Sequence, residues 1–394
     1  MKIVSPPRVI LGSKSLGFAG AELAKINAQN VLIICGGFHS RNPESLQLLC
    51  DSLDKVGIRY QTWHSVDPNT NWVQASRIIE FAKERQVDTV LAIGGGSVID
   101  MAKAVAFGVP SETDVFDFYE RNETVRSALK IVAVPTMIGT GSEGSDGGVL
   151  TKNGRKLSYG SEFGIPLSAL LDPDLLTNLS NESVLCGLGD AMSHVLERYF
   201  CKREGQIMDL GDEFLLVIFK TLIKHVQKIA IERRDPIDLD LEELMWVCHI
   251  AHNGYLSIGK RGDWATHTIA HELETISGSK HGHAVGLIFP YWIDEIYAKR
   301  MAMCDRLTDA IDPYLELFEP VDCSALKSKT AVLVQRLFRA CGAPKTLREI
   351  GIESGSIELI VRATTATTKS GTIGNLEWLD QTQVRDILHK AIGE

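Results

Sequence analysis

The sequence lacks the features that would place the protein in a membrane, outside the cell or on a nucleic acid. It has no uncharged apolar run long enough to span a bilayer, and the opening residues MKIVSPP break too early for a signal peptide. A net charge of −9 provides no general basic surface for nucleic acid or anionic lipid. The eight cysteines include no CxxC pair, which argues against a disulfide framework or a cysteine zinc site. We therefore expect a cytoplasmic protein with no membrane or nucleic-acid partner.

The rest of the composition is that of an ordinary globular protein, and its length of 394 residues suggests two domains. Strand-like apolar runs at 31–37, 58–65, 89–97 and 130–136 alternate with amphipathic stretches at 43–56 and 71–86. This alternation predicts βαβ units and a parallel sheet. After residue 180 long helical periods dominate. The sequence thus predicts a Rossmann-like α/β domain over 1–180 and an α-helical domain over 181–394.

Two glycine-rich loops follow predicted strands. In LAIGGGSVIDMAKAVA, residues 91–106, three glycines and Ser97 lead from a strand into a helix. Glycines let a phosphate approach the backbone, and the helix N-terminus offers free N–H groups, although a tight turn would need only one glycine. The sequence has no GxGxxG and no Walker lysine motif. The second loop, PTMIGTGSEGSDGG at 135–148, would border a crevice together with the first.

A set of histidines and one aspartate has the spacing of a metal site. Asp190 and His194 lie four residues apart on one helical face, and His267 and His271 repeat that spacing on a second helix. A zinc-protease HExxH motif is excluded because Thr275 replaces its second histidine. Two interpretations stay open. The residues form a mixed nitrogen and oxygen site for Fe(II) or Zn(II), or they are core histidines whose hydrogen bonds are made within the protein. The metal-site interpretation uses these residues: Asp190, His194, His267 and His281.

Five segments resemble those of the iron-containing, group III alcohol dehydrogenases, in that family's order over nearly the whole chain. They are GGGSVID (94–100), PTMIGTGSE (135–143), LLDPDLL (170–176), GDAMSHVLERY (189–199) and DWATHTIAHELETISGSKHGHAVGLIFPYW (263–292). The DWATH, AHEL and FPYW runs are most similar to the branch of NADPH-dependent butanol dehydrogenases and aldehyde reductases. The resemblance implies a dinucleotide-binding domain followed by a helical metal-binding domain, a fold of the dehydroquinate synthase type.

The resemblance also implies roles for individual residues. The family's metal ligands fall on Asp190, His194, His267 and His281, and His271 matches its histidine close to the nicotinamide and substrate. The residues that match the family's cofactor contacts are Gly95, Gly96, Ser97, Asp100, Thr136, Thr140, Ser142 and Lys156. We expect hydride transfer between NAD(P)H and an aldehyde or alcohol bound to a divalent metal, Fe²⁺ before Zn²⁺.

The first strand and the loop after it bear on cofactor choice. NAD-preferring members of the family tend to carry an aspartate where Gly36 stands, to hold the adenosine ribose. Without that carboxylate a 2′-phosphate is not repelled, so we expect NADP(H) over NAD(H). Gly36, Gly37, His39 and Ser40 are the residues expected at that end of the cofactor.

Other functions compete with this prediction. A dehydroquinate-synthase-like lyase shares the fold and uses NAD transiently. Its metal site resembles a Glu/His/His set, which differs from the pattern of one aspartate and three histidines found here. A non-catalytic binding protein would keep the fold without turnover. The substrate could also be a polyol or sugar acid, since family membership does not choose among substrates. A homodimer is expected from the resemblance.

Overall fold

The computed structural model describes residues 7–37, 42–67, 69–203, 209–235, 240–257, 260–320 and 325–393. Internal packing divides the chain into two compact units. One, here called the nucleotide unit, comprises 3–178 and 240–255; the other, the helical unit, comprises 179–239 and 256–394. The segment 240–255 thus packs with the first unit although it lies within the second half of the sequence.

The nucleotide unit is built on a six-stranded sheet in which every pairing is parallel. The strand order is β1 (Arg8–Leu11), β8 (Ser168–Leu171), β5 (Lys130–Pro135), β4 (Thr89–Gly94), β2 (Asn30–Cys35) and β3 (Arg59–Trp63). Three of these, β3 to β5, lie within predicted strand segments, and β2 begins one residue before the predicted run 31–37. The short strands β1 and β8 were not anticipated. Every residue of β2 and β4 is buried, as expected for parallel strands covered on both faces.

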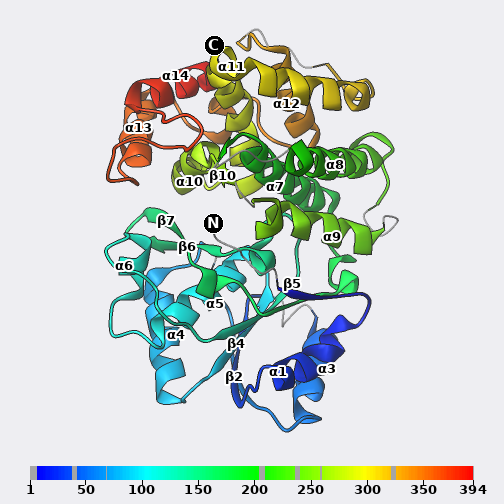
Figure 1. Ribbon diagram of the computed structural model, residues 1–394, viewed down its shortest axis with the longest axis vertical. Helices are drawn as coiled ribbons and strands as arrows, with labels where there is room; N and C mark the ends of the chain where they lie inside the picture. The colour runs from blue at the N-terminus through cyan, green and yellow to red at the C-terminus, as the bar shows by residue number, and fades with distance from the viewer. Residues whose placement is uncertain are drawn as a thin grey trace. The chain divides into compact units, whose positions relative to one another are not determined.

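Helices cover both faces of this sheet (Figure 1). Alternate residues of β2 point in opposite directions, so Leu32 belongs to the core beneath one set of helices and Ile33 to the core beneath the other. The first set is α4 (Trp72–Glu84), α5 (Gly96–Gly108) and α6 (Val115–Tyr119); the second is α1 (Ala19–Lys25) and α3 (Pro43–Asp54). The predicted amphipathic segments at 43–56 and 71–86 contain α3 and α4.

Two further elements of this unit surround the second glycine-rich loop. The antiparallel hairpin of β6 (Gly147–Lys152) and β7 (Arg155–Gly160) turns at Asn153 and Gly154, both with positive φ. Helix α9 (Leu241–His252) packs on the loop from the other side: a Cβ added to Gly141 would lie 2.4 Å from His252 Cβ. The loop can therefore lie directly against α9 only with glycine at this position.

The helical unit confirms the predicted fold class of the second half of the chain, although segment 240–255 packs with the other unit. Its helices are α7 (Asn181–Tyr199), α8 (Asp209–Val226), α10 (Ala265–Ser277), α11 (His281–Leu315), α12 (Lys329–Ala340), α13 (Ile357–Thr365) and α14 (Gln381–Ile392) (Figure 1). A short antiparallel pair, β9 (Cys201–Arg203) and β10 (Lys260–Gly262), was not predicted. The start of α11 lies against α7, since a Cβ on Gly282 would be 2.3 Å from the carbonyl oxygen of Cys186.

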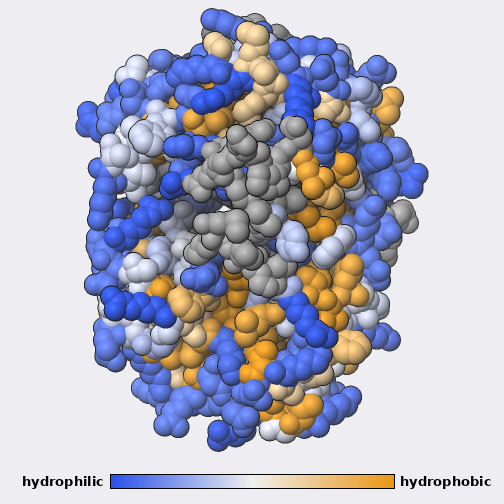
Figure 2. Space-filling model, viewed as in Figure 1, coloured by the Kyte–Doolittle hydropathy of each residue, from blue (hydrophilic) through white to orange (hydrophobic). Residues whose placement is uncertain are grey.

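The surface mixes charged and apolar residues, and Figure 2 shows apolar patches between hydrophilic ones on the face drawn. Leu210, Phe214 and Val217 on α8 are each more than half exposed. Among the described residues, no helix combines the length and the apolar character needed to cross a membrane.

Candidate metal centre

Helix α7 contributes two side chains to the candidate site. Ser180 caps the helix by accepting a hydrogen bond from the N–H of Ser183, and the residues from Gly187 to Tyr199 are all buried. Asp190 and His194 are 3% exposed and one turn apart, with His194 Nε2 3.6 Å from Asp190 Oδ1. Their spacing in the sequence thus brings a carboxylate and an imidazole together inside the protein.

Helices α10 and α11 bring two more histidines to the same point. His267 lies in the first turn of α10, and its ring centroid is 5.0 Å from that of His194. His281 is the first residue of α11, and its Nε2 lies 3.4 Å from Asp190 Oδ1. The close contact at Gly282 is what allows α11 to begin beside Asp190. All four predicted ligands therefore meet within the helical unit.

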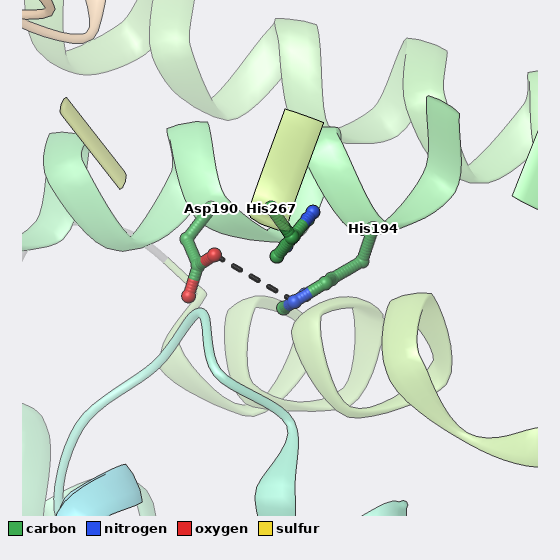
Figure 3. Close-up of side chains that lie close together, drawn as sticks. All are labelled: Asp190, His194 and His267. Atoms are coloured by element: carbon green, nitrogen blue, oxygen red, sulfur yellow. Dashed lines mark ion pairs between the residues drawn. The ribbon is translucent and has the colours of Figure 1, made fainter. Parts of the chain in front are cut away.

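The donor set fits a divalent metal. Ligand atoms of Asp190, His194 and His267 all lie within 4.8 Å of one another, and Figure 3 shows Asp190 and His194 directed toward each other with His267 beside them. His267 Nε2 is buried and has no hydrogen-bond partner among the residues that the structure describes. A buried ring nitrogen of this kind needs a partner, and a metal ion would supply one. One carboxylate with three imidazoles is a donor set that suits Fe(II) or Zn(II).

Two glutamates behind the histidines were missed by the sequence analysis. Glu197 Oε1 lies 3.1 Å from His267 Nδ1 and also accepts a hydrogen bond from the hydroxyl of Thr266. Glu274 Oε1 lies 2.6 Å from His281 Nδ1. Metal-binding histidines commonly donate their second ring N–H to a carboxylate. Glu197 falls three residues after His194, on the same helix, and that spacing was the available signal.

Two buried carboxylates, those of Glu197 and Asp263, hold the turn before α10 in place. Trp264 adopts φ 65°, and its N–H donates to Glu197 Oε2 at 2.5 Å. The neighbouring Asp263 accepts hydrogen bonds from the N–H groups of Asn375 and Leu376, at 2.9 and 2.7 Å. Burial, and then the nearby Glu197 carboxylate, raise the pKa of Asp263 to about 7. The turn is thereby tied to the segment before α14.

His271 lies one turn after His267 on α10 and is half-buried. Its ring is stacked on that of His281, with centroids 5.5 Å apart and an interplanar angle of 30°. One nitrogen of His271, one of His281 and an oxygen of Glu274 lie within 4.8 Å of one another. The expected catalytic histidine therefore lies beside the predicted ligands but does not belong to the group formed by Asp190, His194 and His267.

In the nucleotide unit, the two glycine-rich loops touch. The first loop ends at Gly95, which precedes α5, so Gly96 and Ser97 form the first turn of that helix. A Cβ on Gly96 would lie 2.8 Å from Thr140 Cγ2 in the second loop, and one on Gly95 would lie 3.3 Å from Met137 Sδ. Residues expected from both loops are thus adjacent, at the carboxyl ends of β4 and β5.

Buried polar contacts hold the second loop in place. Asp100 accepts hydrogen bonds from the Ser142 hydroxyl at 2.6 Å and from the Val149 N–H at 3.0 Å, so both oxygens of its carboxylate are bound within the protein. Lys103 is fully buried and donates to the carbonyl oxygens of Ser145 and Gly147. Burial raises the pKa of Asp100 and lowers that of Lys103. Asp100 and Ser142 therefore fix the loop, and direct contact with a cofactor stays a prediction for them.

The remaining predicted cofactor residues lie at scattered positions in the same unit. Thr136 is buried, and its N–H donates to the carbonyl oxygen of Gly94, while Lys156 is half-buried on β7. Gly36 is buried after β2 and Gly37 is exposed. His39 and Ser40 lie outside the described residues.

Two family models match the chain, one in each half of the sequence. The family model for iron-containing alcohol dehydrogenase matches residues 6–173, and that for the Fe-containing alcohol dehydrogenase family, C-terminal, matches residues 184–392. The chain is 29% identical to NADH-dependent butanol dehydrogenase A of Clostridium acetobutylicum over 98% of both chains. It is 27% identical to the NADPH-dependent aldehyde reductase YqhD of Escherichia coli over 91% of both.

Solved structures give the same result. The crystal structure of NADH-dependent butanol dehydrogenase A from Thermotoga maritima is 28% identical, with a TM-score of 0.89 covering 100% of this chain and 98% of that one. The two family models together span both units of the structure. The chain belongs to the iron-containing alcohol dehydrogenase family.

Proposed function

We propose that the protein reduces aldehydes, and oxidises the corresponding alcohols, with NAD(P)H as hydride carrier and a divalent metal in the helical unit. Membership of the family makes it a metal-dependent oxidoreductase of this type. The observation that carries the proposal is the meeting of Asp190, His194, His267 and His281. A lyase of the dehydroquinate synthase type is disfavoured by the same four residues.

The four ligand candidates have two different roles in holding the metal. Asp190 supplies the negative charge that offsets the ion, while the imidazoles of His194, His267 and His281 supply neutral nitrogen donors. A bound Fe(II), or in second place Zn(II), would act as a Lewis acid that polarises the substrate carbonyl. His271, next to this set, is the residue we assign to holding and moving the proton of the alcohol hydroxyl.

For the cofactor we propose NADP(H) in preference to NAD(H). Relatives are named for either cofactor, as in the NADH-dependent butanol dehydrogenase and the NADPH-dependent reductase above. The residue after β2 supports the proposal, because Gly36 provides no carboxylate to repel a 2′-phosphate. The loops at 94–97 and 135–143 would hold the pyrophosphate.

An aspartate introduced after β2 tests the preference. A Cβ on Gly36 would lie 3.0 Å from Val98 Cγ2, whereas a Cβ on Gly37 would have no neighbour within 4 Å. Gly37→Asp therefore adds the carboxylate without a clash, and it should shift kcat/KM toward NADH; Gly37→Asn is the uncharged control. An unchanged ratio of kcat/KM for NADPH and NADH in Gly37→Asp and Gly36→Asp alike would place the ribose elsewhere.

The function itself is tested by anaerobic oxidation of NADPH and of NADH with butanal. Metal-stripped protein is assayed before and after addition of Fe(II) or Zn(II). We expect turnover only with metal, one NAD(P)H consumed per aldehyde. A lyase would show no net change in cofactor. Failure with both cofactors and both metals, on butanal and then on polyols, sugar acids and semialdehydes, would overturn the proposal.

A homodimer and a cytoplasmic location complete the proposal. The dimer rests on the resemblance, and the location rests on the composition of the sequence. Light scattering during gel filtration would give the mass of the assembly, and a value near that of one chain, 43.3 kDa, would contradict the dimer.

A further inference from the structure

A carboxylate faces each of the two ring nitrogens of His281. Its Nε2 lies 3.4 Å from Asp190 Oδ1 and its Nδ1 lies 2.6 Å from Glu274 Oε1. A nitrogen that binds a metal must present its lone pair, so the ring proton of a neutral ligand imidazole lies on the other nitrogen. His281 meets this condition when Nδ1 carries the proton and donates it to Glu274.

Glu274 also reaches the candidate catalytic histidine. Glu274 follows His271 by three residues on α10, which places both on one side of the helix. A nitrogen of His271 lies within 4.8 Å of the Glu274 and His281 donor atoms, and the two histidine rings are stacked. The carboxylate therefore lies beside both a ligand candidate and the residue assigned to proton transfer.

We infer that Glu274 is a positioning residue shared by His271 and His281. It fixes the tautomer and ring orientation of His281 through the bond to Nδ1, and through the ring stack it sets where His271 lies. The inference rests on the proposed function, since it assigns both histidines to one reaction. Nothing in the sequence pattern distinguished Glu274 from an ordinary helix-surface residue.

Glu197 provides the comparison within the same site. It faces His267 Nδ1 at 3.1 Å, as Glu274 faces His281, but its side chain is fully buried and also accepts from Trp264 N–H and the Thr266 hydroxyl. Those contacts are with a backbone N–H and a side-chain hydroxyl, and neither of them involves His271. Glu197 should therefore affect metal binding alone, while Glu274 should affect metal binding and turnover.

The experiment compares Glu274→Gln with Glu197→Gln and with Glu182→Gln as matched control. Glu182 pairs with Lys280, the residue before α11, but contacts no ligand candidate in the described part of the chain. Each variant preserves side-chain shape and removes one carboxylate. Readouts are the Zn(II) dissociation constant by chelator competition, the visible spectrum of the Co(II)-loaded protein, the number of metal ions per chain, and kcat and KM for aldehyde at saturating metal.

We expect Glu274→Gln and Glu197→Gln to bind Zn(II) about 10- to 100-fold more weakly, with an altered Co(II) spectrum, and Glu182→Gln to match wild type. Saturating metal should restore kcat in Glu197→Gln but leave kcat in Glu274→Gln near the level of His271→Ala, with KM little changed. Adding His271→Ala to Glu274→Gln should cost little more, because the two residues act together.

Three results would overturn the inference. The first is a Zn(II) dissociation constant of Glu274→Gln equal to that of Glu182→Gln. The second is a failure of the link to His271 in turnover, seen either as full recovery of kcat at saturating metal or as additive losses in the double variant. The third is two metal ions per wild-type chain, which would make His271, Glu274 and His281 a second cation site. The metal readouts need no turnover, so loss of the proposed function would appear separately, as an inactive wild type.

Discussion

Replacing Gly96 with alanine tests how the two glycine-rich loops act together. The added Cβ would lie 2.8 Å from Thr140 Cγ2, 3.0 Å from its Oγ1 and 3.1 Å from its Cβ. Thr140 is β-branched and has few alternative rotamers, so the loop backbone must move. Overpacking of this kind costs roughly 1–3 kcal/mol, while alanine in a helix regains about 0.5–1 kcal/mol over glycine.

The net cost lies between about 0 and 2.5 kcal/mol, and its midpoint of about 1.3 kcal/mol corresponds to a factor of roughly 9 in an equilibrium constant. Since both loops are proposed to hold the pyrophosphate, we expect the dissociation constant for NADPH to increase by this factor. The assay is NADPH fluorescence on metal-free protein, which separates cofactor affinity from metal chemistry. Metal content should stay that of wild type, because Gly96 and the ligand candidates belong to different units.

Two other glycines calibrate the result. Gly147→Ala adds a Cβ with no neighbour within 4 Å, so it should bind NADPH as wild type does. Gly95→Ala meets only the flexible end of Met137 at 3.3 Å and should fall between the two. Equal dissociation constants for wild type, Gly96→Ala and Gly147→Ala would refute the idea that contact between the loops shapes the cofactor site.

The remaining predictions concern the helical unit. His267→Ala should contain no stoichiometric metal and no activity, and metal analysis showing wild-type content would remove it from the ligand set. His271→Ala should keep its metal and lose about 10²–10⁴-fold in kcat, as for loss of a proton-transfer group. Asp190→Asn should bind Zn(II) more weakly than wild type in a chelator competition, because the charge that offsets the ion is lost. Since the pKa of Asp263 rises from 3.8 to about 7 on folding, its stabilising effect is complete below pH 3.8 and is lost as pH rises toward 7. The melting temperature of metal-free wild type should fall relative to Asp263→Asn over that interval, and parallel pH profiles would contradict the shift.

The sequence predicted the parts of the fold that have a strong period. The apolar runs 31–37 and 89–97 contain most of β2 and all of β4, because central parallel strands must be apolar on both faces. The four-residue spacings of Asp190 with His194 and of His267 with His271 survived as helical faces. Strands β1 and β8 have four residues each, and such short runs carry too little pattern to be separated from loops.

The residues that position the site were harder to predict, because they act through tertiary contacts. Spacing identifies candidates on one helix, but Glu274 meets His281 only because α11 starts where Gly282 permits contact with α7. A glutamate three residues after a histidine is common on helix surfaces, so its sequence position indicates nothing about a ligand on another helix.

Helix α9 shows the same limit at the level of a whole element. Its sequence lies inside the helical half, yet it packs against the second glycine-rich loop: Gly141 fits against His252, and Glu143 Oε1 lies 3.1 Å from His249 Nδ1. Hydrophobic period predicts that residues 241–252 form a helix but cannot say which core the helix joins. Gly141 and Gly144 have no side chain to cover their own backbone. A closely packed element such as α9 therefore covers it. The glycines that made the loop resemble a phosphate site are thus, in part, glycines that admit α9.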